Sequence, residues 1–127
     1  MLRVGLISDT HGLLRPEVKA FLGGSDFIVH GGDICDQAIL DELRALAPVT
    51  AVRGNNDRGA WAEHLAETEW LQVGEIVIVA IHDLSWTAPS QYGEAADLGV
   101  VARAMERFGT RIATVTGNIG DSAVVPT

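Results

Sequence analysis

The sequence predicts an α/β fold built on a parallel sheet. Three short apolar runs, residues 2–7, 27–30 and 49–52, are each followed by a cluster of polar and glycine residues. Segments with apolar residues at helical spacing separate these runs. Strands that alternate with helices form parallel sheets through right-handed crossovers, and their buried strands are continuously apolar. The polar clusters therefore fall at the carboxyl ends of the strands, where open α/β sheets bind their ligands.

Two helices are predicted in the first half of the chain. Pro16 suits the first turn of one helix, and Gly23-Gly24 marks its end. Asp36 is the expected N-cap of the second helix, which Pro48 closes. The apolar stripes of the two helices consist of Leu14, Val18, Phe21 and Leu22, and of Ile39, Leu40, Leu43 and Leu46.

A hairpin, a loop, a helix and a last strand are predicted in the second half. Residues 69–73 and 76–81 flank a glycine-containing turn, and the second of these runs is wholly apolar. It exits into His82-Asp83. The remaining elements are a polar loop over residues 84–95, a helix with apolar positions at Leu98, Val101, Ala102 and Met105, and a strand over residues 111–116.

The composition is that of an ordinary globular protein. The chain has 127 residues, of which 47% are hydrophobic and 20% charged, and no linker or repeat divides it. We therefore expect one domain, residues 1–127. No apolar run approaches the ~20 residues that span a bilayer, and the N-terminus does not resemble a signal peptide, so we expect no membrane association. The single cysteine, Cys35, fits a reducing compartment, and we expect a cytoplasmic location and a buried packing role for this residue.

The charge of the chain restricts its partners. The formal net charge is −8, and no cluster of Lys and Arg is present, which argues against a strong nucleic-acid-binding surface. A phosphorylated substrate remains compatible with this charge if a bound metal ion supplies the positive charge.

Potential metal ligands follow the predicted strands. Asp9 and His11 come one residue apart after the first strand, so both side chains can point into the same volume. Asp33 follows the second strand, Asn55 the third, and His82 the second strand of the hairpin. Carboxylate and imidazole together suit a borderline divalent metal such as Mn²⁺, Zn²⁺ or Fe²⁺. The alternatives are turn-forming roles for the acids and the asparagine, and an exposed or strand-ending role for the histidines.

These motifs resemble those of the calcineurin-like metallophosphoesterases: Asp9-x-His11, Gly32-Asp33, Gly54-Asn55-x-Asp57 and His82, in this order. The length and spacing resemble the small phosphodiesterase branch of bacteria and archaea. The resemblance implies a β-sandwich flanked by helices in four α/β/β/α layers, shortened here at the C-terminus. It also implies two divalent metal ions, with Mn²⁺ expected and Zn²⁺, Fe²⁺, Ni²⁺ or Mg²⁺ as alternatives.

The resemblance also assigns metal ligands. Asp33 would bridge the two ions, because one carboxylate can donate an oxygen to each of them. The other ligands would be Asp9 and His11 for the first ion, and Asn55, His82 and Asn118 for the second.

Three residues would act on the substrate. Asn55 and Asp33 would be catalytic, because they would hold the ions that activate a water for in-line attack on the phosphorus. The amide NH₂ of Asn55 would also donate to a phosphate oxygen. Arg58 would bind the same phosphate, with a solvated surface position as its alternative.

The chain departs from the family pattern at two places. Where the family has Gly-His-x-His, this chain has Gly117-Asn118-Ile119-Gly120, and an amide is a weaker transition-metal ligand than an imidazole. Asn56 stands where relatives often have His or Cys, so a proton for the leaving group must come from water. Both departures predict impaired or altered activity.

Two functions are compatible with this pattern. The first is hydrolysis of a phosphodiester in a small phosphorylated substrate, by a water that two metals activate. The alternative is a non-catalytic scaffold for protein interactions, as in the retromer subunit of the same family. The family has closing strands after the position of residues 111–116 that are missing here, so we expect an exposed sheet edge and a homodimer that covers it. For His30, inside a strand, we expect a core position with satisfied polar atoms rather than a ligand role.

Overall fold

The computed structural model describes residues 2–84 and 112–119, with side chains described for residues 2–82. The predicted loop and helix that follow the hairpin lie outside the described residues, apart from Leu84. None of the helices in the described ranges has the length and apolar character that crossing a membrane requires.

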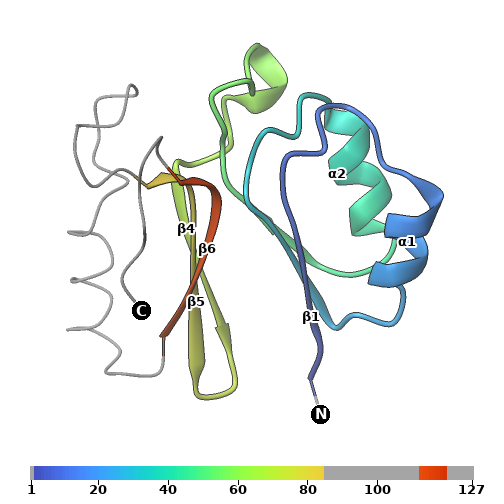
Figure 1. Cartoon of the computed structure of the whole chain (residues 1–127), viewed down its shortest axis with the longest axis vertical. Helices are drawn as coiled ribbons and strands as arrows, with labels where there is room; N and C mark the ends of the chain where they lie inside the picture. The colour runs from blue at the N-terminus through green and yellow to red at the C-terminus, as the bar shows by residue number, and fades with distance from the viewer. Residues whose placement is uncertain (1, 85–111, 120–127) are drawn as a thin grey trace.

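The first sheet is parallel and carries the two helices on one face. Its strands are β1 (Val4–Ile7), β2 (Phe27–His30) and β3 (Val49–Ala51), in that spatial order. Helices α1 (Pro16–Leu22) and α2 (Gln37–Arg44) are the crossover connections, and both lie on the same side of the sheet (Figure 1). The alternation of apolar runs and helical segments predicted this arrangement correctly.

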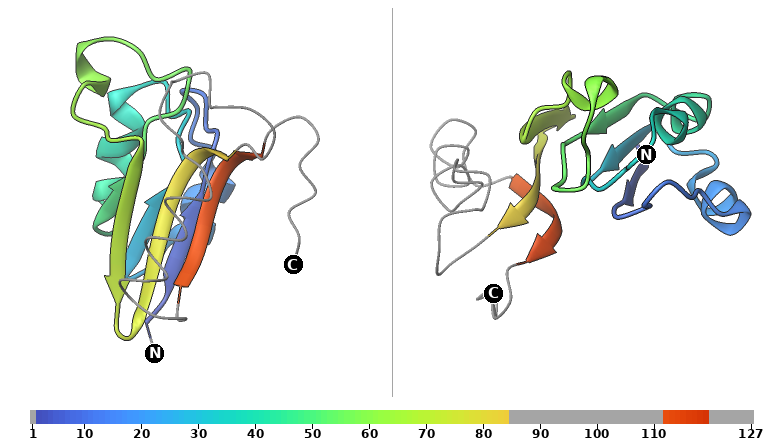
Figure 2. Two further views of the ribbon diagram at one scale, coloured as in Figure 1. Left: turned by 90° about the vertical axis from the view of Figure 1, so that its left-hand side faces the viewer. Right: turned by 90° about the horizontal axis from the view of Figure 1, so that it is seen from above.

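The second sheet packs against the other face of the first. It consists of β4 (Thr68–Val73), β5 (Ile76–Leu84) and β6 (Ile112–Ile119); β4 is antiparallel to β5, and β6 is parallel to β5. Figure 2 shows this sheet beside β1 to β3, on the side away from α1 and α2. The apolar side chains between the sheets include Val29 of β2 and Val52, directly after β3, together with Ile78 and Ala80 of β5. The result is the predicted α/β/β stacking; the fourth layer lies outside the described residues.

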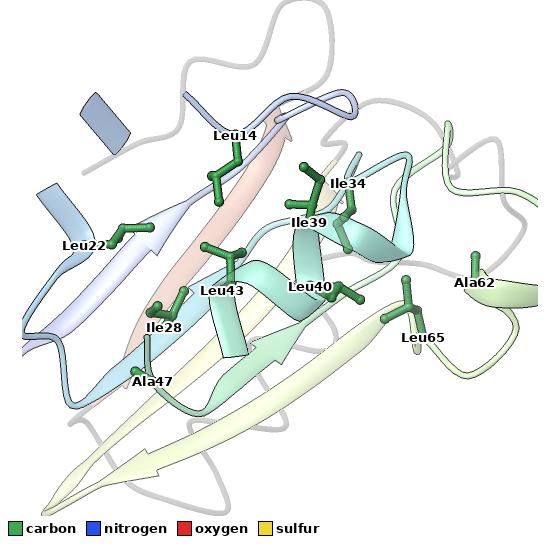
Figure 3. Close-up of a cluster of buried hydrophobic side chains, with 10 residues drawn as sticks. All are labelled: Leu14, Leu22, Ile28, Ile34, Ile39, Leu40, Leu43, Ala47, Ala62 and Leu65. Carbon is green, nitrogen blue, oxygen red and sulfur yellow. The ribbon is translucent and has the colours of Figure 1, made fainter. Parts of the chain in front are cut away.

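A larger apolar cluster lies between the first sheet and the helices (Figure 3). Ile39, Leu40 and Leu43 of α2 are buried there, as their spacing predicted. The expected N-cap is present, since the Asp36 carboxylate accepts a hydrogen bond of 2.9 Å from the Ala38 N–H. Burial of each large aliphatic side chain contributes about 1.5–3 kcal/mol, so this cluster anchors the helices and the loops that lead into them.

The predicted apolar face of α1 was wrong at Phe21. Leu22 is buried and Val18 half-buried, whereas Phe21 is 66% exposed. Val18 and Leu22 are four residues apart and share the face toward the sheet, while Phe21 is rotated about 100° from Leu22. The Arg3 guanidinium lies 5.8 Å from the Phe21 ring centroid and donates to the backbone carbonyls of Phe21 and Gly23.

Two strands extend further than predicted, and this changes the position of two candidate ligands. β5 continues to Leu84, so His82 lies inside a strand rather than after it. β6 continues to Ile119, so Asn118 also lies within a strand, opposite Asp83. The parallel pairing of β5 with β6 keeps both strands extended beyond the point where the apolar runs end.

Candidate metal centre

The loops after β1, β2 and β3 meet beside the far end of β5. Asp9, Asp33 and His82 each offer a ligand atom there, and these atoms lie within 4.8 Å of one another. Asp33 and His82 are buried and Asp9 is exposed, so the group opens to solvent on the Asp9 side. Two carboxylates and an imidazole are a donor set that fits a divalent metal of borderline softness.

Backbone hydrogen bonds hold the loop after β1 against the loop after β2. The Asp9 N–H donates to the Gly32 carbonyl at 2.9 Å, and the His11 N–H donates to the Asp33 carbonyl at 3.0 Å. Asp9 and His11 have positive φ values of 56° and 48°, and Asp33 has 55°. Such left-handed conformations cost about 1–2 kcal/mol for a residue with a Cβ, so the surrounding contacts must maintain them.

His11 lies at the outer side of this group. Its Nε2 is 3.8 Å from an oxygen of Asp9 and 3.7 Å from an oxygen of Asp33, and its side chain is half-exposed. On the opposite side of the ring, Nδ1 lies 3.7 Å from the sulfur of Cys35. The structure thus places His11 beside Asp9 and Asp33, where its Nε2 can serve as a further metal ligand.

The expectation that Cys35 is a buried packing residue was wrong. Cys35 is only partly buried and lies beside His11, with a φ of 69°. The neighbouring Ile34 takes the fully buried position, which turns Cys35 toward the loop surface. Burial of the thiol, and then the charges of Asp57, Asp33 and Asp9, raise the pKa of Cys35. The side chain is therefore a neutral thiol at neutral pH.

The carboxylate of Asp33 is held by one residue of the neighbouring loop. The Asn56 N–H donates to Oδ1 at 2.9 Å, and the Asn56 side-chain NH₂ donates to Oδ2 at 2.8 Å. These two bonds fix the orientation of the carboxylate. The loops can approach this closely because residue 54 is glycine: a Cβ there would overlap the Asp33 carboxylate and backbone nitrogen.

A second buried carboxylate, Asp57, holds the two loops together. It accepts hydrogen bonds from the backbone N–H groups of Asp33, Ile34, Cys35 and Gly54, at 2.7 to 3.0 Å. Sequence reasoning assigned Asp57 no role, although it belongs to the Gly54-Asn55-x-Asp57 motif. No local signal distinguishes it from Asp33, because its donors come mostly from a loop more than 20 residues away.

His82 faces the centre of the group with one nitrogen. Its Nδ1 lies 2.7 Å from the Gly31 carbonyl oxygen, which can only accept, so Nδ1 carries the proton. Nε2 lies 3.2 Å from Oδ1 of Asn55 and 3.6 Å from Oδ1 of Asp33. Three electron-rich atoms that converge in this way fit a cation between them. Gly32 permits the arrangement, since a Cβ there would lie 2.7 Å from Nδ1 of His82.

His30 is a core histidine with partners on both nitrogens, as expected. Its Nδ1 accepts a hydrogen bond from the Gly32 N–H at 3.1 Å, and its Nε2 lies 3.0 Å from the Thr10 hydroxyl. Burial lowers the pKa of His30 to about 4, against the opposing effect of the Asp57 charge. The neutral ring links the loop after β1 to the loop after β2.

A cavity of about 470 Å³ adjoins the group at Asn55, and Arg58 is one of its lining residues. Nε of Arg58 donates to the backbone carbonyl of Asn55 at 3.3 Å, which places the guanidinium beside the candidate centre. The remaining predicted ligand, Asn118, lies in β6, and its side chain is not among those described. Its role as a ligand stays a prediction.

Comparison with known proteins identifies a family for this chain. A family model for the calcineurin-like phosphoesterase superfamily domain matches residues 2–108. A probable metallophosphoesterase of Methanocaldococcus jannaschii is 39% identical over 84 residues, which cover 62% of this chain and 42% of that protein. Another, from Methanothermobacter thermautotrophicus, is 42% identical over 82 residues, covering 58% and 48% respectively. The match thus spans less than half the length of these archaeal relatives.

Solved structures of Vps29 have a similar fold. A single mutant of Vps29 from Entamoeba histolytica superimposes with a TM-score of 0.59 and 26% identity, covering 89% of this chain and 62% of that one. The wild-type protein from the same organism, complexed with Zn²⁺, gives a TM-score of 0.57 and 25% identity, with the same coverage. Vps29 from Chaetomium thermophilum gives 0.62 and 19%, covering 92% and 63%, which supports the fold alone.

Proposed function

This chain belongs to the calcineurin-like phosphoesterase superfamily, in its small archaeal and bacterial branch, and we propose that it is a metal-dependent phosphodiesterase. The observation that carries the proposal is the convergence of ligand atoms from Asp9, Asp33 and His82 within 4.8 Å. A small phosphorylated substrate and self-association as a homodimer are part of the proposal.

Asp33 is the proposed bridging ligand between two divalent ions. Asp9 and His11 would complete one position, and Asn55 and His82 the other. Divalent ions held there would polarise the phosphoryl group and activate water for in-line attack. The Zn²⁺ complex of the Entamoeba histolytica neighbour supports divalent-metal binding, and Mn²⁺ is the ion proposed for this chain.

The remaining residues of the site would bind and orient the substrate. Asn55 has its amide at the junction of the centre and the adjoining cavity, where it would donate to a phosphoryl oxygen. The hydrogen bond from Nε of Arg58 to the Asn55 carbonyl places the guanidinium on the cavity side of Asn55, where it would bind the substrate. Water adds to phosphorus as the bond to the leaving oxygen breaks, and that oxygen takes a proton from solvent, because Asn56 cannot supply one. The products are a phosphomonoester and an alcohol.

The test combines metal content with turnover. Elemental analysis after Mn²⁺ loading should find bound metal, and bis(p-nitrophenyl) phosphate should be hydrolysed only when Mn²⁺ is present. Asp33→Asn should lower the rate at least ~100-fold, by removal of the shared charged ligand. Asp41→Asn, on the exposed face of α2, is the matched control and should leave the rate unchanged. Equal rates for Asp33→Asn and the parent would refute the proposed centre.

A non-catalytic scaffold for protein contacts is the second candidate, and the similarity to Vps29 favours it. The replacement of Gly-His-x-His by Gly117-Asn118-Ile119-Gly120 is compatible with it as well. Metal binding that depends on Asp33, without hydrolysis of aryl diesters or monoesters under any divalent metal, would select the scaffold over the enzyme.

A further inference from the structure

The cavity of about 470 Å³ beside Asn55 is of a size that holds small-molecule ligands. The loop after β3 and the short 3₁₀ turn η1 (Ala60–Ala62) form its wall, with small residues such as Gly59 and Ala60 between the charged ones. Figure 1 shows η1 at the end of the molecule where the loops after β1 and β2 also lie. A substrate bound at the candidate centre would therefore have room to extend over this wall.

The charged residues of the wall are not equally available to a ligand. Arg53 is paired with Glu67, with a nitrogen–oxygen distance of 3.5 Å. Asp57 is buried, and four backbone N–H groups surround its carboxylate. Glu63 is exposed and adds one negative charge. Among the described residues of the wall, Arg58 is therefore the cation that can bind a ligand.

Arg58 is positioned for this task by its hydrogen bond to Asn55. Only Nε takes part in that bond, and its length is 3.3 Å. Within the part of the chain that the structure describes, no hydrogen bond or ion pair involves the two Nη atoms. A guanidinium whose Nη atoms face solvent can grip two oxygens of a phosphate at once.

We propose that this cavity binds a second phosphate group of the substrate, held by Arg58, so that the preferred substrates are phosphodiesters with a further phosphate on one arm. This inference rests on the proposed phosphodiesterase function. The scissile phosphate occupies the metal centre, and the second phosphate lies in the cavity on the other side of Asn55.

Two substrates that differ by one phosphate test the preference. They are thymidine 5′-(p-nitrophenyl phosphate) and its 3′-phosphorylated form, and both release p-nitrophenolate. We expect kcat/KM in Mn²⁺ to be ~10-fold higher for the 3′-phosphorylated substrate, the effect of about one charge-assisted interaction. The ratio of the two values cancels any general effect on the metal centre.

Three variants then distinguish the effect of Arg58 on this ratio from the effect of a change in the net charge of the protein. Arg58→Gln should bring the ratio close to one, and Glu63→Gln should raise it, because a neighbouring negative charge is removed. Arg15→Gln is the control: Arg15 is an exposed arginine outside the cavity, at the N-cap of α1, and its loss should leave the ratio unchanged.

A binding measurement tests the proposed phosphate site without the need for turnover. Titration calorimetry in Mn²⁺ should show thymidine 3′,5′-bisphosphate binding ~10-fold more tightly than thymidine 5′-monophosphate, and Arg58→Gln should remove the difference. This result without hydrolysis would support the phosphate site and refute the phosphodiesterase. Hydrolysis of both substrates at equal kcat/KM, with no effect of Arg58→Gln on the ratio, would overturn the phosphate site while the phosphodiesterase stands. Neither hydrolysis nor selective binding would overturn both.

Discussion

The loop after β2 and the loop after β3 each contain an aspartate that is 4% exposed, and the two carboxylates have different surroundings. Asp33 accepts two hydrogen bonds from Asn56 and faces the Nε2 atoms of His11 and His82 at 3.7 and 3.6 Å. Asp57 accepts hydrogen bonds from four backbone N–H groups at 2.7 to 3.0 Å.

This difference teaches how to distinguish a ligand from a structural acid. Residue type and burial are the same for Asp33 and Asp57, so neither property decides the role. The four hydrogen bonds of Asp57 come from the backbone, whereas Asp33 lies near two imidazoles. Asp57 therefore shapes the loop that contains Asp33, and Asp33 is the carboxylate that would bind a cation in the proposed centre.

The largest effect is expected when Asp57, the aspartate that holds the loops together, is replaced. Asp57→Asn places an NH₂ group where two backbone donors point, so we expect a loss of about 4 kcal/mol in the free energy of unfolding. Urea denaturation measures it, with Asp41→Asn as the exposed control that should change by less than about 0.5 kcal/mol. A similarly small change in Asp57→Asn would show that the four hydrogen bonds do not stabilise the loops.

The histidine between the same loops should make stability depend on pH. The pKa of His30 is lowered from 6.5 to about 4, so the unfolded chain takes up a proton below pH 6.5 while the folded protein does not until about pH 4. His30 therefore contributes stability above pH 6.5, and about 3 kcal/mol of it is lost as the pH falls to 4. Ring ¹⁵N shifts on the unmodified protein should show His30 neutral at pH 5.5. A His30 midpoint near 6.5 would contradict the buried neutral ring.

Asp33→Asn should weaken metal binding and leave stability nearly unchanged, whereas Asp57→Asn should mainly lower stability. We expect the free energy of unfolding in chelator to change by less than about 1 kcal/mol, because the amide oxygen still accepts from the Asn56 N–H, the Asn56 side-chain amide can rotate to accept from the new NH₂, and a charge near Asp9 is removed. Affinity for Mn²⁺ should fall ~100-fold, which titration calorimetry would detect. If Asp33→Asn lost stability but kept its metal affinity, the roles of the two aspartates would have to be exchanged.

The smallest effect is expected at Asn56, which donates two hydrogen bonds to the Asp33 carboxylate. Asn56→Ala removes the donor to Oδ2 of Asp33 but keeps the backbone donor to Oδ1, so Mn²⁺ affinity should fall ~5- to 10-fold. Asn56→Asp would place a second carboxylate at Oδ2 in place of a donor. We expect it to bind Mn²⁺ differently from Asn56→Ala, by a measurable factor; identical affinities would mean that the side chain does not position Asp33.

The elements of the first sheet were predictable from sequence because their signals are local. Pro16, Gly23-Gly24 and Asp36 mark helix ends through backbone chemistry that needs no distant partner. Phe21 was misassigned because one step along a helix changes the face by about 100°, and only contact with the sheet and Arg3 decides which face is buried. The end of β5 was misplaced because pairing with β6, not the apolar run, determines it.

For the candidate centre, the sequence by itself determined which residues stand at strand ends, namely Asp9, His11, Asp33 and Asn55. It did so because parallel strands separated by helices bring their carboxyl ends to one edge of the sheet. Only the tertiary structure decided that His82 reaches the group from inside β5, that Asp57 and Asn56 hold Asp33 in place, and that Cys35 lies beside His11. These arrangements depend on hydrogen bonds between segments more than 20 residues apart, so the local sequence does not predict them.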